Sequence, residues 1–171
     1  MGDRVVRVYL YSANDLRVLF PGEASKTLEK PVERMVAAKL LLRVARGLYA
    51  DNLAVPYRQS SVIGDVAKKL RPESFNYLSL ETALSEWGVI SQIPLSQLTV
   101  MTTGPSGLHR TAFGVIEFTH TKRSVASILE STVASAERPL PIATRKAAIR
   151  DLRRVGRNVD MIDWSEVDDD A

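Results

Sequence analysis

The chain has 171 residues, which is enough for one large hydrophobic core or two small ones. Its composition, 45% hydrophobic and 25% charged, is that of an ordinary globular protein and argues against fibrous, disordered and membrane-spanning classes. The absence of cysteine excludes disulfides, thiolate metal sites and a cysteine nucleophile. Since residues 1–11 lack the apolar core of a signal peptide, we expect a cytoplasmic protein that does not contact a membrane.

The net charge of +3 is distributed unevenly along the chain. Residues 1–60 carry ten basic against six acidic side chains, and residues 138–158 carry seven basic side chains against Asp151 alone. Residues 159–171 then hold six acids and no base. Two basic zones and an acidic tail indicate a surface that binds a polyanion, with a tail that competes for it. The alternative is a set of ordinary solvated helix faces.

The first two predicted elements are a strand and a helix. Residues 4–11 are rich in β-branched and aromatic side chains, which favours a strand, with a short helix as the alternative. Ser12 is placed to cap a helix that runs to about Phe20, because Asp15 three residues later completes a capping box. Pro21-Gly22 would end this helix.

A second helix and a hairpin are predicted next. The helix begins between Ser25 and Glu29 and continues to about Leu41, with Pro31 in its first turn, where a missing N–H costs nothing. Residues 41–51 then predict a short β-hairpin with its turn at Arg46-Gly47. Helix, turn, helix and basic hairpin follow one another in the order of a winged helix-turn-helix.

The rest of the chain predicts a mixture of helices and strands. Helices are expected at 60–70, 77–87 and 142–155, and strands at 98–103 and 111–120, with the strands joined by a turn at 104–107. The predicted fold class is therefore α/β (α+β). A winged helix-turn-helix DNA-binding domain would occupy residues 1–55, and a small mixed α/β domain with a basic helix and an acidic tail would occupy residues 56–171.

The second helix of a helix-turn-helix enters the major groove of DNA and contacts bases with residues near its N-terminus. The residues that occupy this position are Ser25, Lys26, Thr27, Lys30 and Arg34. Arg43 and Arg46 are placed on the hairpin like the backbone or minor-groove contacts of a wing. We therefore expect double-stranded DNA as a partner. The alternative is a plain helical hairpin with a solvated basic edge.

The last predicted helix offers a second candidate surface for a nucleic acid or an acidic partner. Its basic residues are Arg145, Lys146, Arg150, Arg153 and Arg154. A solvated face explains these charges equally well, and Asp151 or the acidic tail could neutralise them within the chain.

Enzyme chemistry has little support in the sequence. The two histidines, His109 and His120, show no spacing typical of metal ligands, and no nucleophile motif accompanies Glu117 and His120 at the end of a predicted strand. We expect no catalytic activity, no cofactor and no metal. A small hydrolase or transferase that uses Glu117 and His120 is the less favoured alternative.

Several segments, in order, resemble the AbiEi-type antitoxins. The run LLRVARGLYAD (41–51) resembles the family's wing, and YLSLETALSEWG (77–88) followed by VISQIP is similar to its Ser-x-x-[ST]-Ala-Leu helix. LTVMTTG and FGVIEFTHT resemble the next pair of strands, and IATRKAAIRDL (142–152) is similar to its Ala-x-x-[KR]-Ala-x-x-Asp helix. The matches cover residues 12 to about 155.

The resemblance implies an antitoxin of a bacterial type IV toxin–antitoxin pair, encoded beside a nucleotidyltransferase-like toxin. Its N-terminal domain would bind inverted repeats in its own promoter, often as two copies, and repress the operon. Its C-terminal domain would carry the protective activity, which the family exerts without a stable complex with the toxin. A protein-interaction module that binds an acidic partner without DNA is the alternative function.

Overall fold

A computed structural model describes residues 9–20, 28–55, 62–91, 96–162 and 164. The chain divides into two compact units between Val62 and Ile63, at the start of a helix. The predicted domain boundary after residue 55 lies shortly before this division. Each unit is described below by itself.

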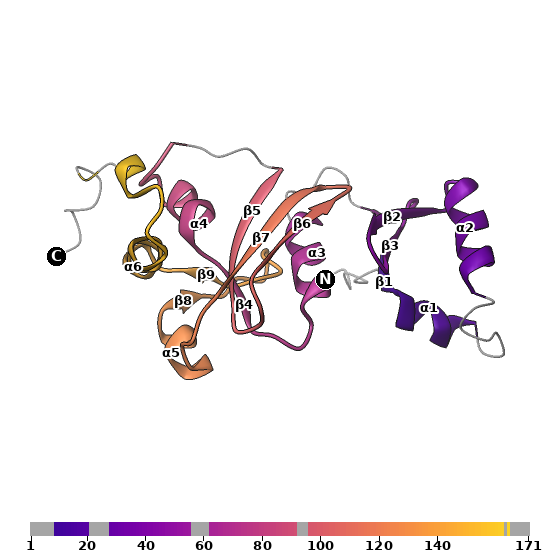
Figure 1. The fold of residues 1–171 in the computed structure, drawn as a ribbon, viewed down its shortest axis with the longest axis horizontal. Helices are drawn as coiled ribbons and strands as arrows, with labels where there is room; N and C mark the ends of the chain where they lie inside the picture. Colours follow the sequence, from indigo (N-terminus) through magenta and orange to yellow (C-terminus); the bar gives the residue numbers. More distant parts are fainter. Residues whose placement is uncertain (1–8, 21–27, 56–61, 92–95, 163, 165–171) are drawn as a thin grey trace, which may run out of the picture. The chain divides into compact units, whose positions relative to one another are not determined.

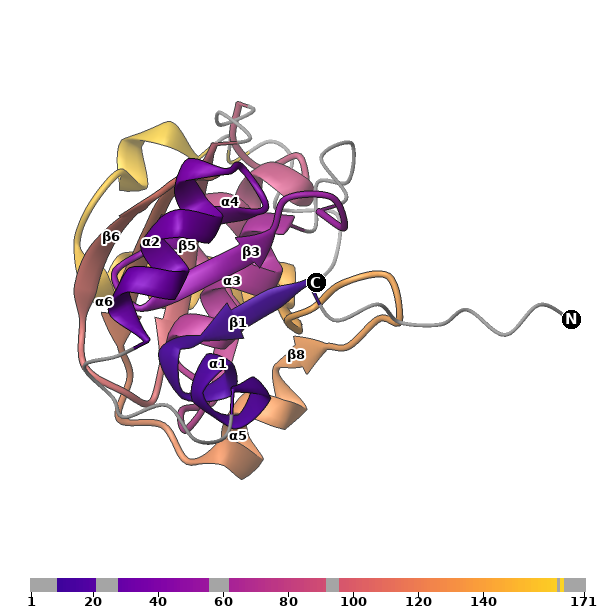
Figure 2. The ribbon, with the colours of Figure 1, turned by 90° about the vertical axis from the view of Figure 1, so that its right-hand side faces the viewer.

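The first unit contains a three-stranded antiparallel sheet and two helices (Figures 1 and 2). Its elements along the chain are β1 (Leu10–Ser12), α1 (Ala13–Leu19), α2 (Glu29–Ala37), β2 (Leu41–Ala45) and β3 (Leu48–Asp51). The strand order β1-β3-β2 places the last strand in the middle. In both views α1 and α2 lie apart from each other.

Helix α1 begins with the predicted capping box. The Ser12 hydroxyl accepts a hydrogen bond from the Asp15 backbone N–H at 3.1 Å, and the Asp15 carboxylate accepts one from the Ser12 N–H at 2.7 Å. Two N–H groups that a helix start leaves unpaired are thereby satisfied. The prediction of a helix capped by Ser12 is confirmed.

Helix α2 ends earlier than predicted, at Ala37 instead of about Leu41. Lys39 adopts a left-handed conformation (φ 58°), the Lys39 N–H donates to the Val36 carbonyl, and the Leu40 N–H donates to the Met35 carbonyl. These two bonds form a Schellman motif, which usually has glycine at the left-handed position. The prediction was wrong because lysine gives no sign of a helix end.

The predicted hairpin is confirmed. Strands β2 and β3 pair antiparallel and are joined at Arg46-Gly47, where Gly47 has φ 72°. Their register shifts between Arg43 and Ala45, which places a bulge beside the turn.

The second unit is built around a mixed sheet whose six strands, among the residues the structure describes, follow the order β6-β7-β5-β4-β9-β8. Its elements are α3 (Val62–Leu70), β4 (Asn76–Leu78), α4 (Leu80–Glu86), β5 (Gln97–Thr102), β6 (Gly107–Thr111), β7 (Gly114–His120), α5 (Val125–Glu130), β8 (Thr132–Val133), β9 (Ile142–Ala143), α6 (Arg145–Val155) and the 3-10 helix η1 (Val159–Met161). Figure 1 shows α4 and α6 on one side of this sheet and α3 on the other.

The strand register explains which side chains meet which helices. Thr99 and Glu117 are paired in register and face α4 and the segment after α6. Their neighbours Val100 and Phe118 face the opposite side, where the guanidinium of Arg71, just after α3, lies 5.2 Å from the centre of the Phe118 ring. Alternation along each strand therefore gives the sheet two buried faces, and the fold class is α+β, as predicted.

The helices predicted at 77–87 and 142–155 are shorter in the structure, because the first residues of each segment form a strand. Asn76–Leu78 forms β4 instead of a helical turn, and the hydroxyl of Ser79 donates to Asp151 instead of capping α4. Ile142–Ala143 forms β9, so the last helix starts only after Thr144, whose hydroxyl accepts from the Ala147 N–H. Both errors have one cause: the two segments pair with other strands, β4 with β5, β9 with β8, and the two with each other, which local sequence does not reveal.

The turn at 104–107 is present, but it leads into a strand that was not predicted. Residues 107–111 form β6, which makes the hairpin with β7, whereas β5 and β7 pair in parallel. His109 consequently lies in a strand and not in the predicted loop.

Candidate nucleic-acid interface

Helix α2 has a buried apolar side, and its exposed side carries two bases as well as Glu29 and Glu33. Leu28 and Val32 are buried, 6% and 8% exposed, while Lys30 and Arg34 are exposed and lie one turn apart. Among the residues that the structure describes, none forms an ion pair or a side-chain hydrogen bond with Lys30 or Arg34. Two cations therefore project from the same side of the predicted recognition helix without a partner among the described residues.

Three further residues predicted to contact DNA lie outside the described residues. These are Ser25, Lys26 and Thr27. Their assignment to the interface stays a prediction.

The two arginines of the hairpin differ in their surroundings. Arg46 is exposed in the turn between β2 and β3. Arg43 lies within β2, and its guanidinium stacks 5.9 Å from the centre of the Tyr49 ring. Arg46 is therefore the residue at the tip of the hairpin, where the wing of a winged helix reaches a DNA backbone.

The basic surface of α6 is partly engaged in contacts within the chain. Lys146, Arg150, Arg153 and Arg154 are exposed, and Arg145 is half-buried. The Arg153 guanidinium lies 4.7 Å from the centre of the Trp164 ring, and the Arg154 side chain donates to the His120 carbonyl at 3.4 Å. The five predicted residues thus do not present one uniform cationic face.

Asp151, the acid within the basic helix, is buried (0% exposed). One of its carboxylate oxygens accepts hydrogen bonds from the Tyr77 hydroxyl at 3.0 Å and the Ser79 hydroxyl at 2.9 Å. Burial, with the adjacent Asp151 carboxylate, raises the pKa of Tyr77 well above its usual range, so this hydroxyl stays protonated and donates. The other oxygen lies 3.7 Å from Nε of both Arg123 and Arg150.

Sequence reasoning missed Arg123 as a residue that contacts Asp151 of α6. It lies in the loop after β7, twenty-eight positions (151 − 123) before Asp151, and comes close to α6 only through the fold. No spacing or motif in the sequence signals that contact.

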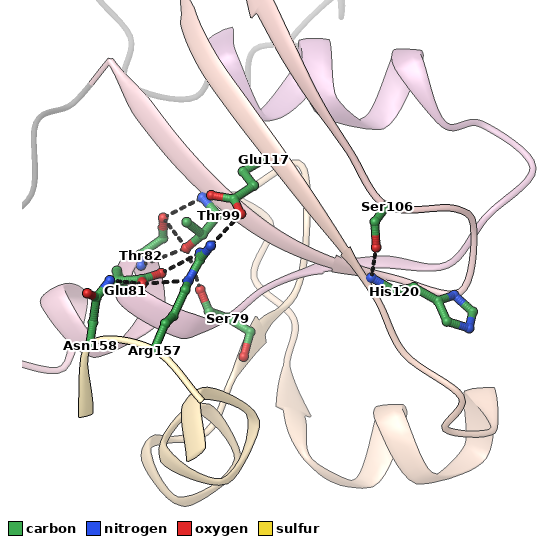
Figure 3. Close-up of polar contacts among 9 residues, drawn as sticks. All are labelled: Ser79, Glu81, Thr82, Thr99, Ser106, Glu117, His120, Arg157 and Asn158. Atoms are coloured by element: carbon green, nitrogen blue, oxygen red, sulfur yellow. Dashed lines mark hydrogen bonds and ion pairs between the residues drawn. The ribbon is translucent and has the colours of Figure 1, made fainter. Parts of the chain in front are cut away.

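Glu117 and His120, the pair that the less favoured enzyme alternative would use, have separate partners (Figure 3). Glu117 accepts a hydrogen bond from Arg157, which also donates to Glu81 at 3.0 and 3.1 Å. The His120 ring nitrogen Nδ1 lies 2.8 Å from the Gly104 carbonyl oxygen, and the His120 N–H donates to Ser106. Because an odd number of positions separates them, Glu117 and His120 point to opposite faces of β7.

The Arg157 cluster joins the segment after α6 to the sheet. Burial alone would lower the pKa of Arg157, but hydrogen bonds to Glu117 and Glu81 outweigh it and raise that pKa. Asn158 also donates to Glu81, at 2.7 Å. Each charged side chain of this cluster forms an ion pair with an oppositely charged one, which is typical of a structural ion-pair network.

Comparisons with known proteins add no relative: no family model matches the chain, and no curated protein or solved structure matches it. Within the described ranges, no three His, Asp or Glu side chains are grouped so that they could hold a metal ion. The helices in those ranges are all too short or too polar to cross a membrane.

Proposed function

We propose that this protein is a cytoplasmic, non-catalytic antitoxin that binds inverted repeats in the promoter of its own operon and counters a nucleotidyltransferase-like toxin. The observation that carries the DNA-binding part is the exposed pair Lys30 and Arg34 on α2, on the side opposite its buried residues. A helix that packs with one side and exposes cations on the other is suited to a DNA groove.

The arrangement of the first unit supports this proposal. The elements follow the order β1-α1-α2-β2-β3, and β3 is the central strand of the sheet. Helix α2 is therefore followed by the β2–β3 hairpin, whose tip carries Arg46. Lys30 and Arg34 would contact base edges or phosphates, and Arg46 would contact the flanking backbone. Protection against the toxin is assigned to the second unit on the resemblance of residues 77–152 to the antitoxin family, without an assumed toxin complex.

The test is a titration of the full chain against a fragment of its own promoter, followed by fluorescence anisotropy. Lys30→Ala and Arg34→Ala should each weaken binding by about 1–3 kcal/mol where the residue contacts a base. The slope of log affinity against log salt should fall by about 0.9 for each lost phosphate contact. Lys68→Ala with Arg110→Ala is the matched control, because both residues are exposed cations of the second unit.

Two results would contradict the DNA-binding proposal. One is no binding to the promoter fragment even at low ionic strength, and the other is unchanged affinity in both α2 variants. Protection is tested separately, by asking whether co-expression of the chain restores growth to cells that carry the neighbouring nucleotidyltransferase-like gene.

A second candidate function is binding of an acidic protein partner by α6. The exposed side chains of Lys146 and Arg150 favour it. A pull-down with the product of the neighbouring gene at moderate salt decides, because a stable complex that is lost in Lys146→Glu with Arg150→Glu would support this function.

A further inference from the structure

Two arginines from separate parts of the second unit converge on one buried carboxylate oxygen. Arg123 lies in the loop before α5, Arg150 lies on α6, and the Nε atom of each is 3.7 Å from Oδ1 of Asp151. The side chains of Arg123 and Arg150 are 27% and 41% exposed, whereas that of Asp151 is 0% exposed. The fold therefore brings two guanidinium groups together at the protein surface, beside a single buried carboxylate.

This arginine pair carries more positive charge than Asp151 can neutralise. Two guanidinium groups share one carboxylate, and Lys146 and Arg154, one turn of α6 before and after Arg150, are exposed as well. In the part of the chain that the structure describes, no second acidic side chain forms an ion pair with any of these four basic residues. A local surplus of positive charge of this kind attracts an anion from solvent.

The guanidinium groups of the pair also have unused hydrogen-bond donors. A separation of 3.7 Å is too long for a hydrogen bond, and no described residue accepts one from the guanidinium group of Arg123 or Arg150. The Arg157 cluster differs, because Arg157 donates to Glu81 at 3.0 and 3.1 Å. An arginine that only stabilises the fold uses its donors in that way, whereas the donors of the pair are available to another acceptor.

The backbone that carries each arginine is held in place by the fold. The Arg123 N–H donates to the Thr121 hydroxyl at 3.3 Å, and the Thr121 N–H donates to the Thr102 carbonyl at the end of β5 at 2.8 Å. Arg150 belongs to α6, and the neighbouring Asp151 is fixed to β4 and the residue after it by two hydroxyl groups. A ligand that binds both arginines therefore needs to order little of the protein.

We infer that Arg123 and Arg150 form a binding site for a phosphate group, with Lys146 adding positive charge beside it. A guanidinium group presents its N–H donors in a planar fork that fits two oxygens of a phosphate. Two forks suit a phosphate better than a carboxylate, because a phosphate group offers three acceptor oxygens and a carboxylate only two. The phosphate belongs to a small phosphorylated compound or to the backbone of a nucleic acid. The inference does not depend on promoter binding, which is proposed for the first unit.

Isothermal titration calorimetry of the full chain tests the inference with two probes, inorganic pyrophosphate and single-stranded oligothymidylate. All proteins carry Lys30→Ala and Arg34→Ala, so that the proposed DNA-binding side of α2 does not contribute. Arg123→Gln and Arg150→Gln should each weaken binding of the probe at least about tenfold, because each removes charge-assisted hydrogen bonds. Lys68→Gln with Arg110→Gln removes two exposed cations elsewhere in the second unit and should leave the affinity unchanged.

The two probes distinguish the sources of the phosphate. Tighter binding of pyrophosphate supports a small phosphorylated ligand, and tighter binding of oligothymidylate supports a nucleic-acid backbone. Arg150→Gln leaves Arg123 beside Asp151, so this variant keeps the test valid if Arg123→Gln does not fold. Binding of neither probe, or unchanged affinity in the arginine variants, would overturn the inference. Tighter binding of glutarate than of pyrophosphate would overturn it too and would favour an acidic protein partner.

Discussion

The two units of the chain satisfy their charged and apolar groups in opposite ways. In the second unit, Glu81 (7% exposed) and Glu117 share Arg157, and Asp151 is enclosed by hydroxyls and arginines. In the first unit, Lys30 and Arg34 face solvent and a hollow of about 610 Å³ separates the helices. The second unit therefore pairs its buried charges within the fold, whereas the first unit leaves Lys30 and Arg34 in solvent and a hollow between its helices.

The largest loss of stability is expected at Gly114 of the second unit, where the fold leaves no room for a side chain. Gly114 has φ 132°, and a Cβ there would lie 2.1 Å from the backbone oxygen of Ser96. Gly114→Ala should therefore cost about 3 kcal/mol or more of unfolding free energy. Urea unfolding followed by tryptophan fluorescence measures it, because both tryptophans of the chain, Trp87 and Trp164, belong to the second unit.

A glycine of the first unit supplies the contrast. Gly47 also has positive φ (72°), but no atom lies within 4 Å of the Cβ that alanine would add. Gly47→Ala should cost about 1 kcal/mol, the strain of the left-handed conformation alone. Hydrogen exchange of the β2–β3 amides measures this cost. Equal losses at Gly114 and Gly47 would contradict the contrast between a closed and an open unit.

The next effect concerns the enclosed ion pairs of the second unit. Arg157→Met keeps most of the side-chain volume but leaves Glu81 without a cation, which should cost about 2–3 kcal/mol. Arg138→Met is the matched control, since the pair of Arg138 with Glu86 is exposed on both sides (40% and 37%) and should cost less than about 1 kcal/mol. Similar losses in both variants would show that burial does not determine the strength of these pairs.

A stabilising change is expected in the first unit. Lys39 is exposed and holds a left-handed conformation that glycine adopts without strain, so Lys39→Gly should stabilise the unit by about 0.5–1 kcal/mol. Ala38→Gly, next to it with an ordinary φ of −76°, should destabilise the unit instead. Slower hydrogen exchange in α2 of the first variant and faster exchange in the second would be the readout, and protection that falls in both would refute the role given to Lys39.

Lys39 also illustrates how far the sequence alone reaches. Features encoded within a few residues were predictable: the capping box of Ser12 and Asp15, and the hairpin turn at Gly47, which has φ 72°. The end of α2 was not, because its left-handed residue is a lysine. Local chemistry identifies an element when the residue type and the required conformation agree.

The sequence alone also does not predict structure that depends on pairing between distant segments. Strands β4 and β9 resemble the first turns of the helices that follow them. They form strands through pairing with other segments, β4 with β5, β9 with β8, and the two with each other across 64 positions (142 − 78). Arg123 reaches Asp151 for the same kind of reason. The cations of α2 could be named in advance because helical spacing places them, whereas only the fold shows that they have no partner among the described residues.

The smallest effect concerns pH, at His109, whose pKa is lowered by burial. Burial, and then the adjacent Arg71 guanidinium, hold the pKa of His109 below 6.5, and its ring packs edge-on against Phe118. The unfolded chain therefore takes up a proton first as pH falls through about 6.5, so stability decreases from there down to the folded pKa and is unaffected above.

The loss should be small because the ring is only half-buried. His109→Gln should remove it, which is measured as a smaller difference in unfolding free energy between about pH 7.5 and about pH 5.5 than in the wild type. An NMR titration of the His109 ring gives the independent check. A midpoint at or above 6.5 would mean that Arg71 and the Phe118 ring do not disfavour the charged imidazole, and that even the packed second unit leaves this side chain effectively in solvent.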